Sequence, residues 1–352
     1  MISLSSRGKS FYFHCAVLIL GVFGVAANSL ILYAMVASKQ HKKHPLIVNQ
    51  NALDLFSCAF MIVTYAVKIR NVYLTGLAGF LLCTTIISEC FIWSGIIGSV
   101  INLASITVER YLKVVRPIWS KNKLRNWMVY SAMAYAWISS LIYNLVLVML
   151  TSTVVDGECY AYAVWKSDTI KAIYFFWNFV SFYVVVFLIF VVCYWRILLV
   201  IRRQARVMAG HNAAGSNAAQ TQSHHIQTNV IKTMIVVSVL HVLSWMPIEL
   251  YFMFVNVDPN LPFLDGLFYA AEIVACLYTC ANPFIYAIKF DPVKQVLVSM
   301  IPCKKTPGQD AEHGANAGTG TGTTASHHAT QERTRHRGLV PIENLTPLHV
   351  ER

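Results

Sequence analysis

The stretch "LASITVERYLKVVRPIW", residues 103–119, is apolar for two helical turns and then places an acid and an arginine side by side. Glu109 and Arg110 follow Val108 directly, and Pro117 comes seven residues after the arginine. A proline there predicts the end of the helix, because its ring disfavours a helical conformation at the residue before it. A charged pair that closes an apolar run indicates the boundary between a lipid core and water.

The composition of the whole chain agrees with a membrane protein. Its 352 residues are 56% hydrophobic and 12% charged, whereas a soluble domain carries roughly 25% charged residues. The net charge of +12 does not indicate nucleic-acid binding, because the basic residues are scattered between apolar runs. The segment before the first apolar run has no small-residue cleavage site, so we interpret that run as a spanning helix rather than a signal peptide.

Seven stretches are long and apolar enough to cross a bilayer, which takes about 20 residues. They are residues 11–36, 45–67, 77–114, 126–150, 170–201, 229–255 and 263–288. The expected fold class is therefore an all-α membrane protein, a bundle of seven transmembrane helices. Lys and Arg are enriched after the first, third, fifth and seventh stretches, which predicts a cytoplasmic C-terminus and an extracellular N-terminus. Lys68 and Arg70, on the first outer loop, run against this pattern.

The remaining segments complete the predicted domain organisation: an extracellular tail at residues 1–10, a membrane domain at 11–290, an amphipathic eighth helix at 291–302 and a disordered cytoplasmic tail at 303–352. Residues 207–227 are small and polar, which predicts a mobile loop. Cys303 is either a palmitoylation site that would bind membrane lipid or a plain reduced thiol, and the sequence leaves both readings open.

Four polar residues lie inside the apolar stretches. A charge at mid-membrane costs about 2.5–3.5 kcal/mol on insertion scales, so such residues are candidates for function. The alternative is a hydrogen-bonded network that only packs helices together. The four are Asn28, Asp54, Ser99 and Asn282.

Each of the seven stretches carries its own short motif, and these motifs follow one another in order along the chain. They are Asn28, Asp54, Glu109–Arg110–Tyr111, Trp137, Tyr194, Trp245–Met246–Pro247 and "NPFIY" at residues 282–286. Together they resemble the rhodopsin-like (class A) G protein-coupled receptors over roughly residues 21–303. The chain departs from that pattern at several positions, with Glu109 in place of Asp, Gln50 in place of Leu, His241 in place of Phe and Val186 in place of Pro.

The resemblance implies a plasma-membrane receptor that activates heterotrimeric G proteins and has no catalytic or metal site. It implies an activation switch, a hinge and a site for an allosteric Na⁺, with no other cofactor. The switch residues would be Glu109, Arg110, Tyr111, Pro117, Ile118, Tyr194, Asn282, Pro283 and Tyr286; the hinge would be Trp245 and Pro247; the sodium-site residues would be Asp54, Ser99, Asn282 and Asn28.

The resemblance also implies partners and a bridge. Phosphorylation of the tail by a receptor kinase would recruit arrestin, at Thr319, Thr321, Thr323, Thr324 and Ser326. A disulfide would join Cys83 to Cys159. Because Cys83 lies two residues further from Arg110 than is usual, Cys90 is the alternative partner, and its depth in the helix makes it the second choice. Gln227 stands where the family carries an acid that locks Arg110, so we expect measurable basal activity.

The outer half of the bundle suggests an acidic, aromatic ligand pocket. The expected lining is Glu89, Trp93, Asn178, Phe182, Trp245, Glu249, Glu272 and Cys276. Ile92 stands where amine receptors carry an aspartate, so a biogenic amine bound in the usual way is not expected. Cys276 stands where opsins carry the retinal lysine, so a retinal Schiff base is not expected either. We predict a cationic ligand, such as a basic peptide. Alternatively, the glutamates face water or pair with one another.

Three other functions were weighed. A transporter is disfavoured because the seven stretches show no repeated halves. A membrane enzyme is disfavoured because His224 and His225 stand alone without metal-ligand spacing. A seven-helix scaffold without signalling remains the closest alternative.

Overall fold

The computed structural model describes residues 4–211, 218–258, 261–289 and 291–300. Within these ranges, seven helices are long and apolar enough to cross a membrane, so the predicted all-α, seven-span architecture is confirmed. The candidate spans are Ser10–Ala37, Pro45–Arg70, Gly76–Val115, Asn126–Thr151, Asp168–Gln204, Ile231–Val257 and Asp265–Ile285.

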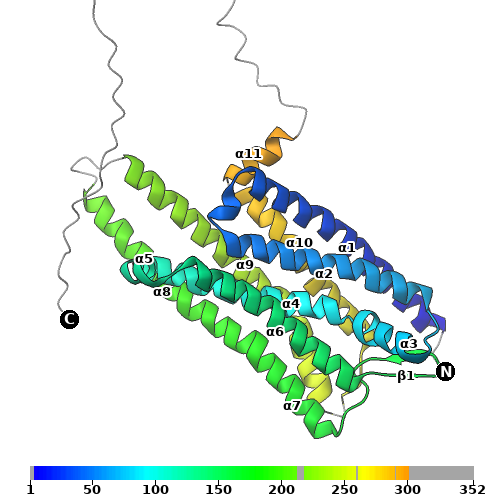
Figure 1. The fold of residues 1–352 in the computed structure, drawn as a ribbon. Coiled ribbons are helices and arrows are strands. Elements are labelled where there is room, and N and C mark those ends of the chain that lie inside the picture. The colour runs from blue at the N-terminus through cyan, green and yellow to red at the C-terminus, as the bar shows by residue number, and fades with distance from the viewer. Residues whose placement is uncertain (1–3, 212–217, 259–260, 290, 301–352) are drawn as a thin grey trace, which may run out of the picture. The chain divides into compact units, whose positions relative to one another are not determined.

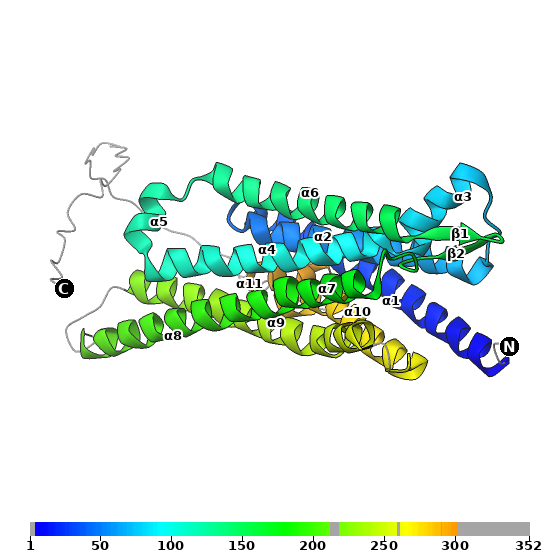
Figure 2. The same ribbon diagram turned by 90° about the horizontal axis from the view of Figure 1, so that it is seen from below.

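The spanning helices pack as a closed ring of neighbours (Figures 1 and 2). The helices are α1 (Leu4–Ala37), α2 (Pro45–Arg70), α4 (Cys90–Val115), α6 (Asn126–Thr151), α7 (Asp168–Asn178) with α8 (Val185–His211), α9 (Ala218–Val257) and α10 (Asp265–Lys289). Helix α1 packs on α2, α2 on α4, α4 on α8, α7 on α9, α9 on α10, and α10 returns to α1. Helix α6 lies outside the ring against α4. Helix α4 therefore connects α6 to the ring, since it packs against α2, α6 and α8.

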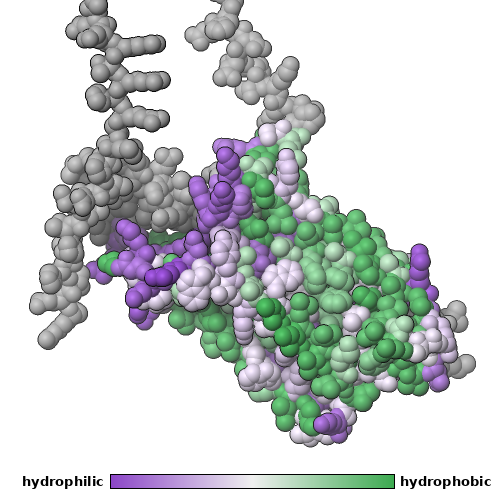
Figure 3. Space-filling view, viewed as in Figure 1, coloured by the Kyte–Doolittle hydropathy of each residue, from purple (hydrophilic) through white to green (hydrophobic). Residues whose placement is uncertain are grey.

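The outer surface of the bundle is hydrophobic where lipid would surround it. Figure 3 shows hydrophobic residues over the middle of one face and hydrophilic residues gathered towards its ends. Large apolar side chains on that surface, such as Ile142 and Leu188, are more than half exposed. This distribution is unfavourable in water and favourable in a hydrocarbon core.

The third span contains a break that the sequence analysis did not predict. Helix α3 (Gly76–Leu82) continues into a π-helical segment, Cys83–Ile87, and α4 begins only at Cys90. Between them Glu89 adopts φ +64°, a left-handed conformation that costs free energy for a residue with a side chain. The π-helical segment and the break lie between Cys83 and Arg110, which the resemblance placed two residues further apart than usual.

The loop after α6 forms a short hairpin of β1 (Thr153–Val155) and β2 (Glu158–Tyr160), with Val154 opposite Cys159. Its turn, Asp156–Gly157, has positive φ at both residues, as a two-residue hairpin loop requires. A side chain at Gly157 would clash with the ring of Tyr73, since a Cβ there would lie 2.0 Å from that ring. The Leu74 amide donates to the Gly157 carbonyl and fixes the hairpin against the start of α3.

The inner ends of the helices differ from the predicted loops. Helix α4 ends at Val115 and a second helix, α5 (Pro117–Lys123), begins at Pro117, so this proline both ends one helix and starts the next. Helix α8 continues to His211 and α9 begins at Ala218, because the alanines and glutamines of the predicted loop favour helix. The mobile loop predicted over residues 207–227 is therefore largely helical where the structure describes it.

A short helix, α11 (Asp291–Ser299), follows the seventh span and packs against α1 and α10. Val293 is buried in a hydrophobic core that also contains Ile31 of α1, and Val296 and Leu297 are partly buried against this core. The structure thus contains the predicted eighth helix. Cys303 and the phosphorylation candidates of the tail lie outside the described residues.

Candidate functional site

A cavity of about 590 Å³ lies between the outer halves of the helices. This volume is typical of small-ligand sites. Six of the eight predicted pocket residues line it: Glu89, Trp93, Asn178, Phe182, Trp245 and Glu249. The other two, Glu272 and Cys276, line a much smaller neighbouring cavity that shares the walls Glu89, Trp93 and Trp245.

Glu89 is held by three side chains. Lys68 pairs with its carboxylate at close range, the Tyr65 hydroxyl lies 2.8 Å from Oε1, and the Trp93 indole N–H donates to Oε2 at 3.2 Å. These partners stabilise the left-handed backbone of Glu89. The ion pair with Glu89 also explains why a lysine occurs at position 68, where it ran against the predicted enrichment of Lys and Arg on the cytoplasmic side.

Glu272 lies across from Glu89, and both contact Tyr65. The Tyr65 hydroxyl is 2.9 Å from the Glu272 carboxyl and 2.8 Å from that of Glu89. One phenol has a single proton to donate. Tyr65 can therefore donate to only one of the two carboxyl groups at a time, and the other bonds the phenol oxygen only as a protonated acid. Glu272 lines the small cavity and not the large one.

Glu249 differs from these two acids. It lies one turn outside Trp245 on α9, lines the large cavity and has nearby phenols at Tyr143, Tyr174 and Tyr183. Within the described ranges of the chain, no side chain pairs with its carboxylate. Of the three predicted acids, Glu249 alone presents an uncompensated carboxylate to the cavity.

The inner end of the cavity is aromatic. Trp245 contacts Trp93 edge-on at 6.2 Å between ring centroids, and the His241 ring lies 5.2 Å from that of Tyr278. Pro247 stands inside α9, two residues outside Trp245, where it removes a backbone hydrogen bond. The inner end of the cavity therefore reaches Trp245, one of the two residues predicted to form the hinge.

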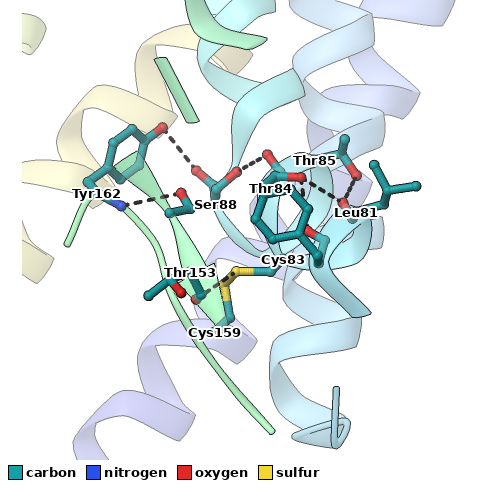
Figure 4. Close-up of a disulfide and its surroundings, with 10 residues drawn as sticks. Leu81, Cys83, Thr84, Thr85, Ser88, Thr153, Cys159 and Tyr162 are labelled. Carbon is teal, nitrogen blue, oxygen red and sulfur yellow. Dashed lines mark hydrogen bonds between the residues drawn. A yellow bond between two sulfur atoms is a disulfide. The ribbon is translucent and has the colours of Figure 1, made fainter. Parts of the chain in front are cut away.

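The loop that carries the β-hairpin lines the cavity with Ala161 and Tyr162, and Figure 4 shows Tyr162 beside the hairpin. Cys159 on β2 forms a disulfide with Cys83, with Cα atoms 5.4 Å apart, which confirms the bridge that the resemblance implied. Cys90 is a free thiol. The Tyr162 hydroxyl donates to the Ser88 carbonyl at 3.2 Å, so the loop is bound to the third span directly at its break. Burial raises the pKa of Tyr162, and this phenol stays protonated.

A chain of buried hydrogen bonds crosses the middle of the bundle. Trp137 donates to Asn49, Asn49 to Asn102, Asn102 to Gln50, Gln50 to Ser99, and Ser99 to Asp54, which also accepts from Asn282. Gln50 replaces the family's usual leucine and extends this chain. The network links α6, α2, α4 and α10 through side chains that sequence spacing alone did not connect.

Three of the four predicted sodium-site residues meet in that network. Ser99 and Asn282 donate to the two oxygens of Asp54 at 2.9 and 2.8 Å. Asn28 instead donates to the backbone carbonyls of Gly24 and Thr279. Among the described residues, no cationic side chain pairs with Asp54, and the buried Oδ1 atoms of Asn28 and Asn282 accept no hydrogen bond. Such an oxygen-rich, anionic cluster fits a hard monovalent cation.

The residues predicted to form the activation switch begin with Glu109 and Arg110, near the C-terminal end of α4. Arg110 Nη2 lies 3.4 Å from the Glu109 carboxylate, and Lys113 pairs with the same carboxylate at 2.7 Å. Both members of the Glu109–Arg110 pair are largely buried. Ile118, on α5, has 78% of its surface exposed.

A second contact to Arg110 was not anticipated from the sequence. Nδ1 of His44, the residue before α2, lies 3.1 Å from Arg110 Nη2. Burial, and then the Arg110 charge, lower the pKa of His44 to about 4, so its imidazole is neutral at pH 7 and accepts the hydrogen bond. The sequence offered one signal, a histidine directly before Pro45, but not the fold that brings it to Arg110.

The remaining switch residues occupy different depths. Tyr194 is buried, and its hydroxyl lies 3.1 Å from both Thr107 and Ser238, which joins α4, α8 and α9. Tyr111 is partly buried against the hydrophobic core that contains Tyr194 and Val293. Pro283 lies inside α10 beside Asn282. The Tyr286 side chain lies outside the described part of the structure.

Comparison with known proteins agrees with this arrangement. Residues 14–286 match the family described as 7 transmembrane receptor (rhodopsin family). The chain is similar to the C-C chemokine receptor type 8 of Homo sapiens, with 25% identity over 302 residues that cover 81% of this chain and 76% of that receptor.

It is also similar to Melanopsin-A of Gadus morhua, with 24% identity over 298 residues that cover 81% of this chain and 51% of that protein. Seven spans, the ordered motifs and the family match across most of the chain all give one answer. The chain is a multi-pass membrane protein of the rhodopsin family of G protein-coupled receptors, not an enzyme.

Proposed function

We propose that this receptor binds a positively charged extracellular ligand in the large cavity, with Glu249 as its counter-ion. The uncompensated Glu249 carboxylate carries the proposal. An unpaired charge is costly away from bulk water, and a cationic group in the ligand would offset that cost. The surrounding phenol and indole rings would add cation–π attraction.

The ligand would act through α9. It would sit on Trp245, next to the proline that weakens the helix at Pro247. A tilt of α9 about this point would move Ser238, whose hydroxyl now bonds to Tyr194. Ligand binding would thereby shift the equilibrium between two packings of the inner half of the bundle.

The inner half would present Arg110 to a heterotrimeric G protein. At rest, Glu109 and His44 hold the guanidinium. On activation, Arg110 would leave these partners, Tyr286 would move inward, and the exposed Ile118 would insert an apolar side chain into the G protein. Arg110→Ala is the natural control for loss of coupling.

The Asp54 cluster would hold a Na⁺ ion that favours the resting state. Asp54, Ser99 and Asn282 would supply its ligands, and the cation would compensate a buried carboxylate. The purified receptor should unfold at a higher temperature in sodium than in N-methylglucamine chloride. Asp54→Asn should remove this difference; a sodium effect that persists would contradict the site.

The proposed placement is the plasma membrane, with residues 1–10 outside and α11 on the inner leaflet. Residues 303–352 would form the cytoplasmic tail, where Cys303 would carry a lipid. Threonines and serine at residues 319–326 would accept phosphate from a receptor kinase and then recruit arrestin.

The ligand proposal is tested by screening cationic, anionic and neutral compounds and short peptides in cells, with G protein dissociation as the readout. Active compounds should be cationic, and Glu249→Gln should reduce their potency at least tenfold. Glu158→Gln, which changes an exposed acid on β2, serves as the matched control. Active compounds that keep their potency on Glu249→Gln would overturn the proposal.

A further inference from the structure

The charged side chains around the large cavity divide into one pair and two single charges. Lys68 and Glu89 neutralise each other. Glu249 and Lys171 also line the cavity, and no ion pair or hydrogen bond to either charged group occurs within the described ranges. The wall therefore presents one uncompensated carboxylate and one uncompensated ammonium.

These two charges lie at different depths. Glu249 is one turn outside Trp245, at the inner end of the cavity. Lys171 lies in the first turn of α7, where its amide donates to Ser167, so it stands at the outer end. A ligand that reaches both must extend along the cavity.

The wall between them is aromatic. Tyr174 and Phe175 follow Lys171 by three and four residues and so share its helical face. Phe175 stacks with Phe252 of α9 at 6.1 Å, and Phe252 contacts Phe268 of α10 at 5.8 Å. Such a wall fits the flat apolar body of a ligand between its two charged ends.

We infer that the ligand class is dipolar: an aromatic compound with an ammonium group for Glu249 and a carboxylate for Lys171. The inference rests on the proposed function, since it specifies the second pole of the same cavity. Glu249 lies at the inner end of the cavity and Lys171 at its outer end near water, so the ammonium contributes more to affinity than the carboxylate. Free aromatic amino acids and short aromatic peptides with free ends share this chemistry.

The test uses the purified full-length receptor and measures binding by thermal unfolding. The probes are aromatic amino acids, dipeptides and tripeptides, each with both ends free, amidated at the C-terminus, acetylated at the N-terminus, or blocked at both ends. Comparison of the amino acids with the peptides distinguishes the two sources of the dipolar group.

Free-ended probes should bind at least fivefold more tightly than their amides and at least fiftyfold more tightly than their acetylated forms. Lys171→Gln should abolish the preference for a free carboxylate and keep the preference for a free amine. Glu249→Gln should do the reverse. Lys166→Gln, which changes an exposed lysine in the loop just before α7, should change neither preference.

The outcomes separate the two claims. Amides that bind as tightly as free acids, or a Lys171→Gln receptor with an unchanged preference, overturn the dipolar ligand and leave the cationic one standing. Acetylated probes that bind as tightly as free amines overturn both. Absence of binding by every free-ended probe overturns the dipolar inference.

Discussion

The neutral imidazole of His44 accepts a hydrogen bond from Arg110 at 3.1 Å. His44 precedes α2, whereas Arg110 belongs to α4, so the contact ties the inner ends of two helices together. Glu109 holds the same guanidinium within its own helix. The α1–α2 connection thus restrains the Arg110 guanidinium through His44.

Removal of this restraint should raise basal signalling. A hydrogen bond to a charged group contributes about 1.5–3 kcal/mol, so His44→Ala should shift the resting equilibrium towards the active state by at least about tenfold. Agonist-independent G protein dissociation at matched surface expression measures the effect. Lys43→Gln, the exposed neighbour, should leave the basal signal unchanged, and equal signals from His44→Ala and the wild type would refute the restraint.

The pH dependence of this contact follows from the lowered pKa of His44. Because the folded pKa of about 4 lies below the ordinary value of 6.5, the unfolded chain binds more protons between these values. The stability contributed by neutral His44 is complete above pH 6.5 and decreases as the pH falls towards 4. As the pH is lowered from 6.5 to 4, the unfolding temperature of the wild type should therefore decrease more steeply than that of His44→Gln. From pH 6.5 to 8, the unfolding temperatures of the two proteins should change in parallel.

Close packing of α2 on α4 depends on Gly95. A Cβ at this position would lie 2.1 Å from Ser57 Oγ and 3.0 Å from the Phe56 ring. Gly95→Ala should therefore destabilise the receptor by about 1–3 kcal/mol, as overpacking usually does. Gly266→Ala is the control, because a Cβ there meets no atom within 4 Å. Equal unfolding temperatures for the two variants would contradict this packing.

The Lys68–Glu89 pair should behave as one unit. Lys68→Met leaves the carboxylate without its cation, and Glu89→Gln leaves the ammonium without its anion, so each single variant should be less stable than the wild type. The double variant should be more stable than the sum of the single effects predicts, by about 1–2 kcal/mol. Additive effects in thermal unfolding would show that the two charges are independent.

The sequence was sufficient for the seven spans, since hydropathy depends on local pattern. The Cys83–Cys159 bridge followed only from the family resemblance, which left Cys90 as a second choice until the structure showed the pairing. The sequence was not sufficient for the contacts of His44 and Lys68. Each of these residues meets its partner only after two helices pack, and no spacing rule connects residues 44 and 110. The Asp156–Gly157 pair did carry a readable hairpin signal, which the sequence analysis did not use.

The break at Glu89 has a consequence for comparing this chain with its relatives. The π-helical turn and the left-handed residue separate the helical register of α3 from that of α4. Residues inward of Glu89 keep their register with Arg110, but residues outward of it do not. Equivalent positions in the outer half are therefore better counted from Cys83, which the disulfide anchors, and ligand contacts assigned by counting outward from Arg110 across Glu89 would fall on the wrong helical face.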